Sequence, residues 1–404
     1  MTAILLDWIE FAVRWLHVIT GVAWIGSSFY FIALDLGLHR DRNLASGADG
    51  EEWQVHGGGF YHIQKYLVAP AQMPSDLIWH KWQSYSTWMS GFALLFVVYY
   101  LGGDLYLIDP AKLDIPVWQG ALISVASLAL GWVLYDRICK SRFGDDNTRL
   151  MIGLYIILVA MAWGYTEVFT GRAALIHLGA FTATIMSANV FFIIIPNQKI
   201  VVADLIVGRK PDPKYGKIAK QRSTHNNYLT LPVVFLMLSN HYPLAFGTEY
   251  NWIIASLVFL MGVTIRHFFN EMHSRRGMLW WTWGATAVIF AIIVWLSTLS
   301  SWSYQEDAAL GGVAERYAAA ENFDLVVDIV TANCSMCHAA EPGWPGMATP
   351  PKDVMLETPA QIAAHAKQIY MQAGVSHAMP PPVAAYIYPE DRAELVRWFE
   401  SVSG

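Results

Sequence analysis

Eight apolar runs, each long enough to cross a lipid bilayer, constrain this chain more than any other feature. A helical span needs about 20 predominantly apolar residues. The runs cover residues 8–36, 79–103, 116–135, 150–169, 173–195, 228–246, 251–271 and 278–299. Because backbone polar groups find no water partners in lipid, each run must be helical. We therefore expect an all-α fold built on an eight-transmembrane-helix bundle.

The composition divides the chain into parts of different character. Of 404 residues, 55% are hydrophobic and only 14% charged, which is too apolar for a single soluble domain. Residues 301–404 carry 5 basic and 13 acidic side chains, a balance of −8, whereas residues 1–300 carry 21 and 19, a balance of +2. We predict a transmembrane domain (1–299), a polar linker (300–313) and an acidic soluble domain (314–404). No basic stripe points to nucleic acid.

The basic residues of the loops predict the orientation of the bundle in the membrane. Alternate loops are basic, through Arg40, Arg42, Lys65, Arg137, Lys140, Arg142, Arg149, Arg266, Arg275, Arg276 and seven residues from Lys199 to Arg222. The opposite loops carry only Lys112 and Arg172. Since cytoplasmic loops carry the excess of Lys and Arg, we expect a bacterial inner-membrane protein with both termini on the periplasmic side. The N-terminus has no basic region and no small-residue cleavage site, which argues against a removable signal peptide.

The soluble part contains Cys334-x-x-Cys337-His338, the attachment motif of a c-type haem. Two thiols one helical turn apart form the thioether bonds, and the histidine that follows is an axial ligand of the iron. A redox dithiol does not require the histidine, and a zinc site would need a second ligand pair that the sequence lacks. Cys139 lies at a predicted membrane edge. We therefore predict one covalent haem c, bound on the periplasmic side, where bacteria attach it.

A sixth iron ligand is expected farther along the chain, and methionine is a frequent choice. Met379 is the best candidate because three prolines follow it and keep that loop out of a helix. Met347 is the nearest rival, and His338 and Met379 are thus the predicted metal ligands. The other methionines are Met336, Met355 and Met371. With helices predicted at 314–333 and 389–402, this part resembles a small class I cytochrome c.

Ionisable side chains inside a membrane are costly and usually functional, and here they fall into two layers. The outer layer comprises Glu10, Arg14, His17, Glu167, Arg172, His177 and His241. The inner layer comprises Asp35, His80, Lys81, Asn189, Asn197, Gln198, His225, Arg266, His267 and Asn270. The inner layer is rich in imidazole, amide and guanidinium groups, which suit a flat, anionic, hydrogen-bonding ligand. The alternative is a basic loop that faces lipid head groups.

The outer histidines suggest a second haem. Trp15-x-His17, with Trp24 seven residues after the histidine, is similar to the first helix of the membrane protoporphyrinogen oxidase family, in which the histidine binds haem b. His17 and His177 are the predicted ligand pair, with His241 as second choice, and the alternative is two hydrogen-bonded histidines. Both follow an arginine and precede small residues, a repeat that would divide the bundle into two four-helix halves.

Four membrane stretches form a distinctive set. They are Arg14-Trp15-Leu16-His17, Trp24-Ile25-Gly26-Ser27-Ser28-Phe29, Trp79-His80-Lys81-Trp82 and Thr224-His225-Asn226-Asn227-Tyr228-Leu229. Together with the C-terminal haem motif, this set resembles the bacterial membrane-bound urate oxidase (urate hydroxylase) family, and the resemblance covers essentially the whole chain. It implies oxidation of urate to 5-hydroxyisourate without O₂, with electrons passing to the fused cytochrome c and on to the respiratory chain.

Under this resemblance the polar layers become candidate urate sites. In the inner layer, Arg222, Asn226 and Gln198 would hold the oxygens and N–H edges of urate. His80 or His225 would accept a proton, since imidazole titrates near neutral pH, and water would attack C5 of the purine. A pocket in the outer layer would instead use Arg14, His17, Glu167 and Arg172.

The expected partners are urate, the lipid bilayer and a soluble cytochrome c or terminal oxidase as electron acceptor. The acidic C-terminal part suits a basic partner, and the sequence leaves the oligomeric state open. Two other functions are compatible with these features. One is an electron-transfer subunit of the quinol:cytochrome c type, with a quinone pocket in the outer layer. The other is a transporter fused to a cytochrome, although transporters tend to break helices at the membrane midplane.

Overall fold

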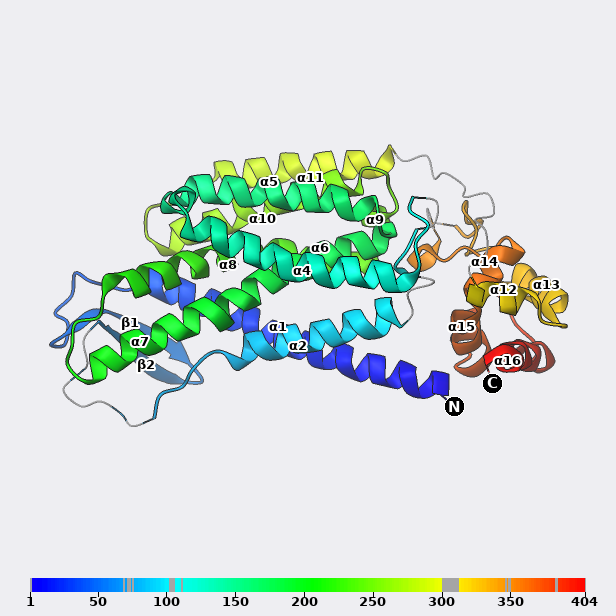
Figure 1. Cartoon of the computed structure of the whole chain (residues 1–404), viewed down its shortest axis with the longest axis horizontal. Coiled ribbons are helices and arrows are strands. Elements are labelled where there is room, and N and C mark those ends of the chain that lie inside the picture. The colour runs from blue at the N-terminus through cyan, green and yellow to red at the C-terminus, as the bar shows by residue number, and fades with distance from the viewer. Residues whose placement is uncertain are drawn as a thin grey trace.

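The structure is a computed structural model, which describes residues 2–67, 70, 74, 76–101, 106–109, 112–299, 312–345, 347, 350–381 and 384–403. Most of the predicted linker 300–313 lies outside the described residues. Long helices lie side by side in a bundle, and a group of short helices lies at one end of it, where the N and C labels also lie (Figure 1).

The bundle follows the apolar runs. Its helices are α1 (Thr2–Gly37), α2 (Trp82–Leu95), α4 (Val117–Lys140), α5 (Asn147–Thr166), α6 (Gly171–Ala188), α7 (Ile195–Ile206), α8 (Pro213–Leu238), α9 (Pro243–Phe246), α10 (Asn251–His273) and α11 (Trp281–Thr298). Short turns are η1 (Phe96–Tyr100), η2 (Arg142–Asp145), η3 (Asn189–Ile194) and η4 (Ser239–His241). Side-chain oxygens of Asp146, Thr170 and Asp212 accept backbone N–H groups at the starts of α5, α6 and α8, which fixes where these helices begin.

The mainly helical fold is confirmed and is compatible with a multi-pass membrane protein, whereas the number of spans stays a prediction. Within the described residues, six helices are long and apolar enough to cross a membrane. Helices stand at all eight predicted positions, but two fall short of that standard. The regular part of α2 has only 14 residues before the turn η1. The first half of α8 is polar, since the helix starts at Pro213, well before the predicted residue 228.

Two segments differ from the sequence-based expectation. The predicted end of a helix at Pro196 is instead a continuation through the π-type turn η3 into α7. A π-type turn leaves a backbone carbonyl without its usual i→i−4 hydrogen bond. Proline has no N–H to donate, so it fits directly after such a turn. The second segment is an antiparallel hairpin of β1 (Ala48–His56) and β2 (Gly59–Tyr66). Gly57 and Gly58 both have positive φ, as a two-residue hairpin turn requires, so the fold is not purely helical.

The hairpin and the short C-terminal helices lie at opposite ends of the bundle (Figure 1). Between them, α4, α5, α6, α8 and α10 enclose an apolar core that includes Leu107, Leu154, Leu175, Phe181, Leu236 and Ala255. Many large apolar side chains on the outer helix faces are exposed, among them Trp8, Phe11, Trp15, Trp118, Ile156, Val288 and Trp295. An apolar face of this extent would not be stable in water, and it suits contact with lipid.

The C-terminal part has an apolar core of its own. Its elements are α12 (Gly312–Ala318), α13 (Phe323–Cys334), η5 (Pro351–Asp353), α14 (Pro359–Ala364), α15 (Ala366–Ile369), η6 (Tyr370–Val375) and α16 (Pro389–Ser403). Trp398 on α16 is fully buried, and its indole N–H donates to the Tyr317 carbonyl at 2.9 Å. The Gln368 amide donates to the Tyr106 hydroxyl, so this part contacts the bundle just before α4.

Candidate functional sites

The Cys-x-x-Cys-His motif occupies the last turn of α13 and the turn that follows. The backbone N–H groups of Cys337 and His338 donate to the Cys334 carbonyl at 3.2 and 2.9 Å, which keeps the three side chains within one turn. Neither cysteine forms a disulfide in the described part of the chain. Burial, followed by the neighbouring Cys337, raises the pKa of Cys334 to about 11, so this sulfur stays protonated at neutral pH.

His338 is arranged as an iron ligand would be. Its Nδ1–H donates to the Val354 carbonyl at 2.7 Å, which leaves the lone pair on Nε2. Burial lowers the pKa of His338, an effect that the hydrogen bond to Val354 partly offsets. A neutral imidazole whose other nitrogen is fixed by a carbonyl is the usual form of a metal-bound histidine. The two thiols and this imidazole therefore fit a covalent haem c.

The predicted sixth ligand, Met379, lies in an irregular segment between η6 and α16. Its backbone N–H donates to the Gln372 carbonyl at 2.9 Å, and its own carbonyl accepts from Arg392 at 3.1 Å. The Met379 side chain is 36% exposed, and Met371 packs against the C-terminal core. Met379 therefore stays the predicted sixth ligand and Met347 its rival.

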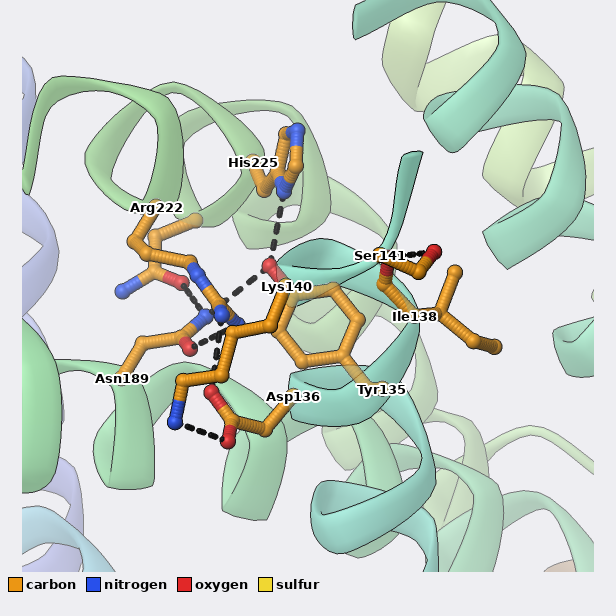
Figure 2. Close-up of polar contacts among 9 residues, drawn as sticks. Tyr135, Asp136, Ile138, Lys140, Ser141, Asn189, Arg222 and His225 are labelled. Carbon is orange, nitrogen blue, oxygen red and sulfur yellow. Dashed lines mark hydrogen bonds and ion pairs between the residues drawn. The ribbon is translucent and has the colours of Figure 1, made fainter. Parts of the chain in front are cut away.

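In the inner layer, the structure joins Arg222 and Asn226 of α8 to α4 and η3 in a buried network (Figure 2). Arg222 donates to the Asp136 carboxylate at 2.8 Å and to the Asn189 side-chain oxygen at 3.2 Å. Lys140 bonds the other Asp136 oxygen at 2.6 Å. The Asn226 oxygen accepts from Asn189 at 3.1 Å, and its amide donates to the Met186 carbonyl at 2.9 Å. The charge of Arg222 and both polar groups of Asn226 are thus already engaged.

The same network includes His225. Because the Asn189 oxygen accepts from Arg222, the Asn189 amide donates to the Tyr135 hydroxyl, at 3.2 Å. The Tyr135 hydroxyl lies 2.7 Å from Nδ1 of His225 and also hydrogen-bonds the Cys139 thiol, so it can donate its proton to either. When it donates to His225, the proton of the neutral imidazole lies on Nε2, a buried atom without a hydrogen-bond partner within the described residues. In this tautomer His225 is a donor, and the predicted role as proton acceptor would require the other tautomer.

His80 and Gln198, the other predicted catalytic residues, lie outside this network. Both side chains are exposed. The His80 ring packs edge-on against Phe31 at 4.7 Å, and Gln83 bonds its Nδ1 at 3.3 Å. Gln198 lies on α7, beyond the turn η3. The five predicted catalytic residues therefore do not form one compact constellation, and their roles toward a substrate stay predictions.

A second buried polar cluster lies on the other side of α8 and combines Arg266 and Asn270 of α10 with Asn227. The Asn227 oxygen accepts from Arg266 Nε at 3.2 Å and from the Asn270 amide at 3.0 Å. The sequence places Arg266 and Asn270 in the inner layer but gives no reason to prefer them over Arg222. The difference between the two arginines lies in their hydrogen-bond partners. Asp136, 86 residues away in the sequence, neutralises Arg222, and no local sequence pattern predicts such a pairing.

The predicted haem b ligands His17 and His177 lie on different helices, and each uses Nδ1 on a backbone carbonyl. His17 donates to Thr87 at 3.0 Å and His177 to Ala173 at 2.7 Å. His177 is fully buried with Nε2 unpaired in the described part of the chain. Aromatic rings crowd its imidazole, with centroids between 4.5 and 5.9 Å from Phe169, Tyr99 and Tyr165. A porphyrin would have to displace them, so the residues as folded do not fit a haem b.

Two arginines of the outer layer, Arg14 and Arg172, contact a carboxylate and an aromatic ring respectively. Arg14 donates to Glu10 at 2.6 Å, one helical turn away, and the Arg172 guanidinium lies 5.1 Å from the centre of the Tyr106 ring. Arg172 Nε is buried without a hydrogen-bond partner among the described residues. The Glu10–Arg14 pair is thus a satisfied ion pair, as intrahelical i, i+4 pairs commonly are.

Comparison with known proteins identifies the helical part of the chain. No curated protein and no solved structure matches the sequence. The family model described as urate oxidase N-terminal matches residues 3–297. That match runs from the first turn of α1 almost to the end of α11 and stops before the cysteine motif. The chain therefore belongs to the urate oxidase N-terminal family.

Proposed function

We propose that this protein oxidises urate to 5-hydroxyisourate without O₂ and passes the electrons to a haem c bound by its own C-terminal part. The reaction balances as urate plus water giving 5-hydroxyisourate, two protons and two electrons. The new C5–O bond takes its oxygen from water. The observation that carries the proposal is the union, in one chain, of a urate oxidase-family helical domain with Cys334, Cys337 and His338.

The C-terminal residues would supply the electron acceptor. Cys334 and Cys337 would form the thioether bonds, and His338 would bind the iron through Nε2, its Nδ1 being held by the Val354 carbonyl. A haem bound there accepts one electron at a time, so each urate requires two transfers. Electrons would then leave to a soluble cytochrome c or a terminal oxidase, and the balance of −8 over residues 301–404 favours a basic docking partner.

The membrane placement supports this division of tasks. The six candidate spans favour a multi-pass membrane protein. The positive-inside pattern would put the hairpin end in the cytoplasm and the C-terminal part in the periplasm. The two ends lie apart along the bundle (Figure 1). In this arrangement urate would be taken from the cytoplasm and its electrons delivered outside, with the bundle between them.

An anaerobic oxidation in H₂¹⁸O tests the proposed reaction. Purified protein is given urate and a soluble one-electron acceptor, and the product is analysed by mass spectrometry. The proposal predicts one ¹⁸O atom from water in 5-hydroxyisourate. Haem reduction by quinol but not by urate would instead favour the quinol:cytochrome c function. Urate flux into vesicles without oxidation would favour the transporter.

Replacing Met379 with leucine is expected to lower the reduction potential of the haem. Methionine ligation raises the potential relative to other axial arrangements, and leucine retains a similar volume without the sulfur. A spectroelectrochemical titration measures the effect, with Met347→Leu as the matched control. An unchanged potential in Met379→Leu together with a lowered one in Met347→Leu would move the sixth ligand to Met347.

A further inference from the structure

The guanidinium of Arg266 is held where α10 meets α8 and α1. Arg266 is only 4% exposed. Its Nε donates to Asn227, and its plane covers the Phe29 ring of α1, with 4.0 Å between the guanidinium carbon and the ring centre. Asn270, one helical turn from Arg266, donates to the same Asn227 oxygen. Three helices therefore fix the position of this cation.

The Arg222 network also has buried atoms without hydrogen-bond partners among the described residues, Arg222 Nε and His225 Nε2, but the Arg266 cluster has more of them and no paired carboxylate. Three of its polar atoms are buried without hydrogen-bond partners in the described part of the chain, namely Arg266 Nη2, Asn227 Nδ2 and Asn270 Oδ1. Within the same residues, no carboxylate forms an ion pair with Arg266, whereas Asp136 lies 2.8 Å from Arg222. Burying a cation without an anionic partner costs stability. An anionic ligand would remove this cost.

We propose that Arg266, Asn227 and Asn270 form the binding site for the urate anion, an inference that rests on the function proposed above. The unpaired groups are two donors and one acceptor on neighbouring side chains. Urate is planar, is a monoanion at neutral pH and carries carbonyl oxygens next to ring N–H groups. Arg266 Nη2 and Asn227 Nδ2 would donate to its oxygens, and Asn270 Oδ1 would accept from a ring N–H.

An open cavity lies at the hairpin end of the bundle and is lined by later turns of the helices that carry Phe29 and Arg266. It has a volume of about 450 Å³ and is lined by α1, α10 and β1, a size typical of small-molecule sites. Ala33 and His273 line this cavity. Ala33 lies about one helical turn from Phe29 on α1, and His273 lies about two turns from Arg266 on α10. His273 is three residues from Asn270, about one turn. Arg42, Arg275 and Glu52 line the cavity. Arg42 also pairs with Glu51 at 3.8 Å, so Arg275 is the cation that favours the approach of an anion.

Two substitutions test this site through binding rather than turnover. Asn227→Asp is nearly isosteric and supplies Arg266 with the carboxylate that it lacks, while Arg266→Gln removes the charge. Binding of ¹⁴C-urate is measured by equilibrium dialysis on full-length protein that has been reduced beforehand, so that no oxidation occurs. Both variants are expected to bind urate roughly 10- to 100-fold more weakly, the effect of losing a charge-assisted hydrogen bond. Arg209→Gln, on an exposed ion pair with Asp204, is the matched control.

The outcomes separate this inference from the proposed function. Folding is checked by thermal unfolding, and Asn227→Asp is expected to be at least as stable as the wild type because it pairs a buried charge. Folded variants that bind urate as tightly as the wild type would overturn the site while leaving urate oxidation intact. Displacement of urate by an equal concentration of inorganic phosphate would also overturn it, as a site for any anion. A wild-type protein that neither binds nor oxidises urate would overturn both proposals.

Discussion

The double substitution Cys334→Ser/Cys337→Ser is expected to abolish covalent haem attachment and to reduce urate-driven electron transfer to background. Each thioether bond requires one of these thiols, and a serine hydroxyl does not form it. Both cysteines lie in the single turn that ends at His338. We therefore expect the substitution to affect only the haem site and to leave the helical domain unchanged. Haem staining after denaturing electrophoresis measures attachment directly.

The third cysteine provides the control for this experiment. Cys139 lies near the end of α4, beside η2 and away from the C-terminal core. Cys139→Ser is expected to keep both the stained haem and the urate-driven reduction. A double variant at Cys334 and Cys337 that still carries covalent haem would show that the motif is not the attachment site. Urate binding should persist in the double variant, because the membrane part is unchanged.

The largest effect on stability is expected from Asp136→Asn. This substitution leaves the Arg222 guanidinium, which is 1% exposed, without its carboxylate. Breaking a buried ion pair by removing one partner costs about 3–5 kcal/mol, because an uncompensated charge stays buried. The free energy of unfolding in detergent should fall by that amount. Asp204→Asn, which removes the partner of the exposed Arg209, should cost only about 0–1 kcal/mol.

A double-mutant cycle distinguishes a structural role for Arg222 from the predicted role in binding urate. Asp136→Asn/Arg222→Gln removes both charges and is expected to be less destabilised than the sum of the single substitutions. If Arg222 is structural, the double variant that folds should bind urate with unchanged affinity. A folded double variant with greatly weakened urate binding would instead favour the sequence-based prediction for Arg222 over the Arg266 site.

Much of the fold could be predicted because its causes are local. The run 251–271 corresponds to α10 (Asn251–His273), and the run 278–299 to α11 (Trp281–Thr298), since length and hydropathy are enough to define a span. The closing helix predicted at 389–402 is α16, Pro389–Ser403. The segment predicted at 314–333 is helical but broken between α12 and α13.

The parts that could not be predicted depend on contacts between distant residues or on turn chemistry within the chain. The hairpin has a local signal in the Gly57-Gly58 turn, but its strands are short and lie outside the apolar runs that define the helices. The extension past Pro196 depends on the π-type turn before it. In the polar layer, the residue types were recognisable, but whether Arg222 or Arg266 is free depends on Asp136, which belongs to another helix. The haem motif was recognisable because its residues are consecutive.

The most direct test of the central claim is anaerobic reduction of the protein-bound haem by urate alone. Oxidised full-length protein is mixed with urate in a stopped-flow spectrophotometer, with no quinol and no soluble acceptor, and the absorbance bands of reduced haem c are followed. Urate oxidation coupled to this haem predicts complete reduction, with two haems reduced for each urate consumed. If a chemical reductant reduces the haem while excess urate does not, the urate domain and the cytochrome motif do not form the proposed electron path.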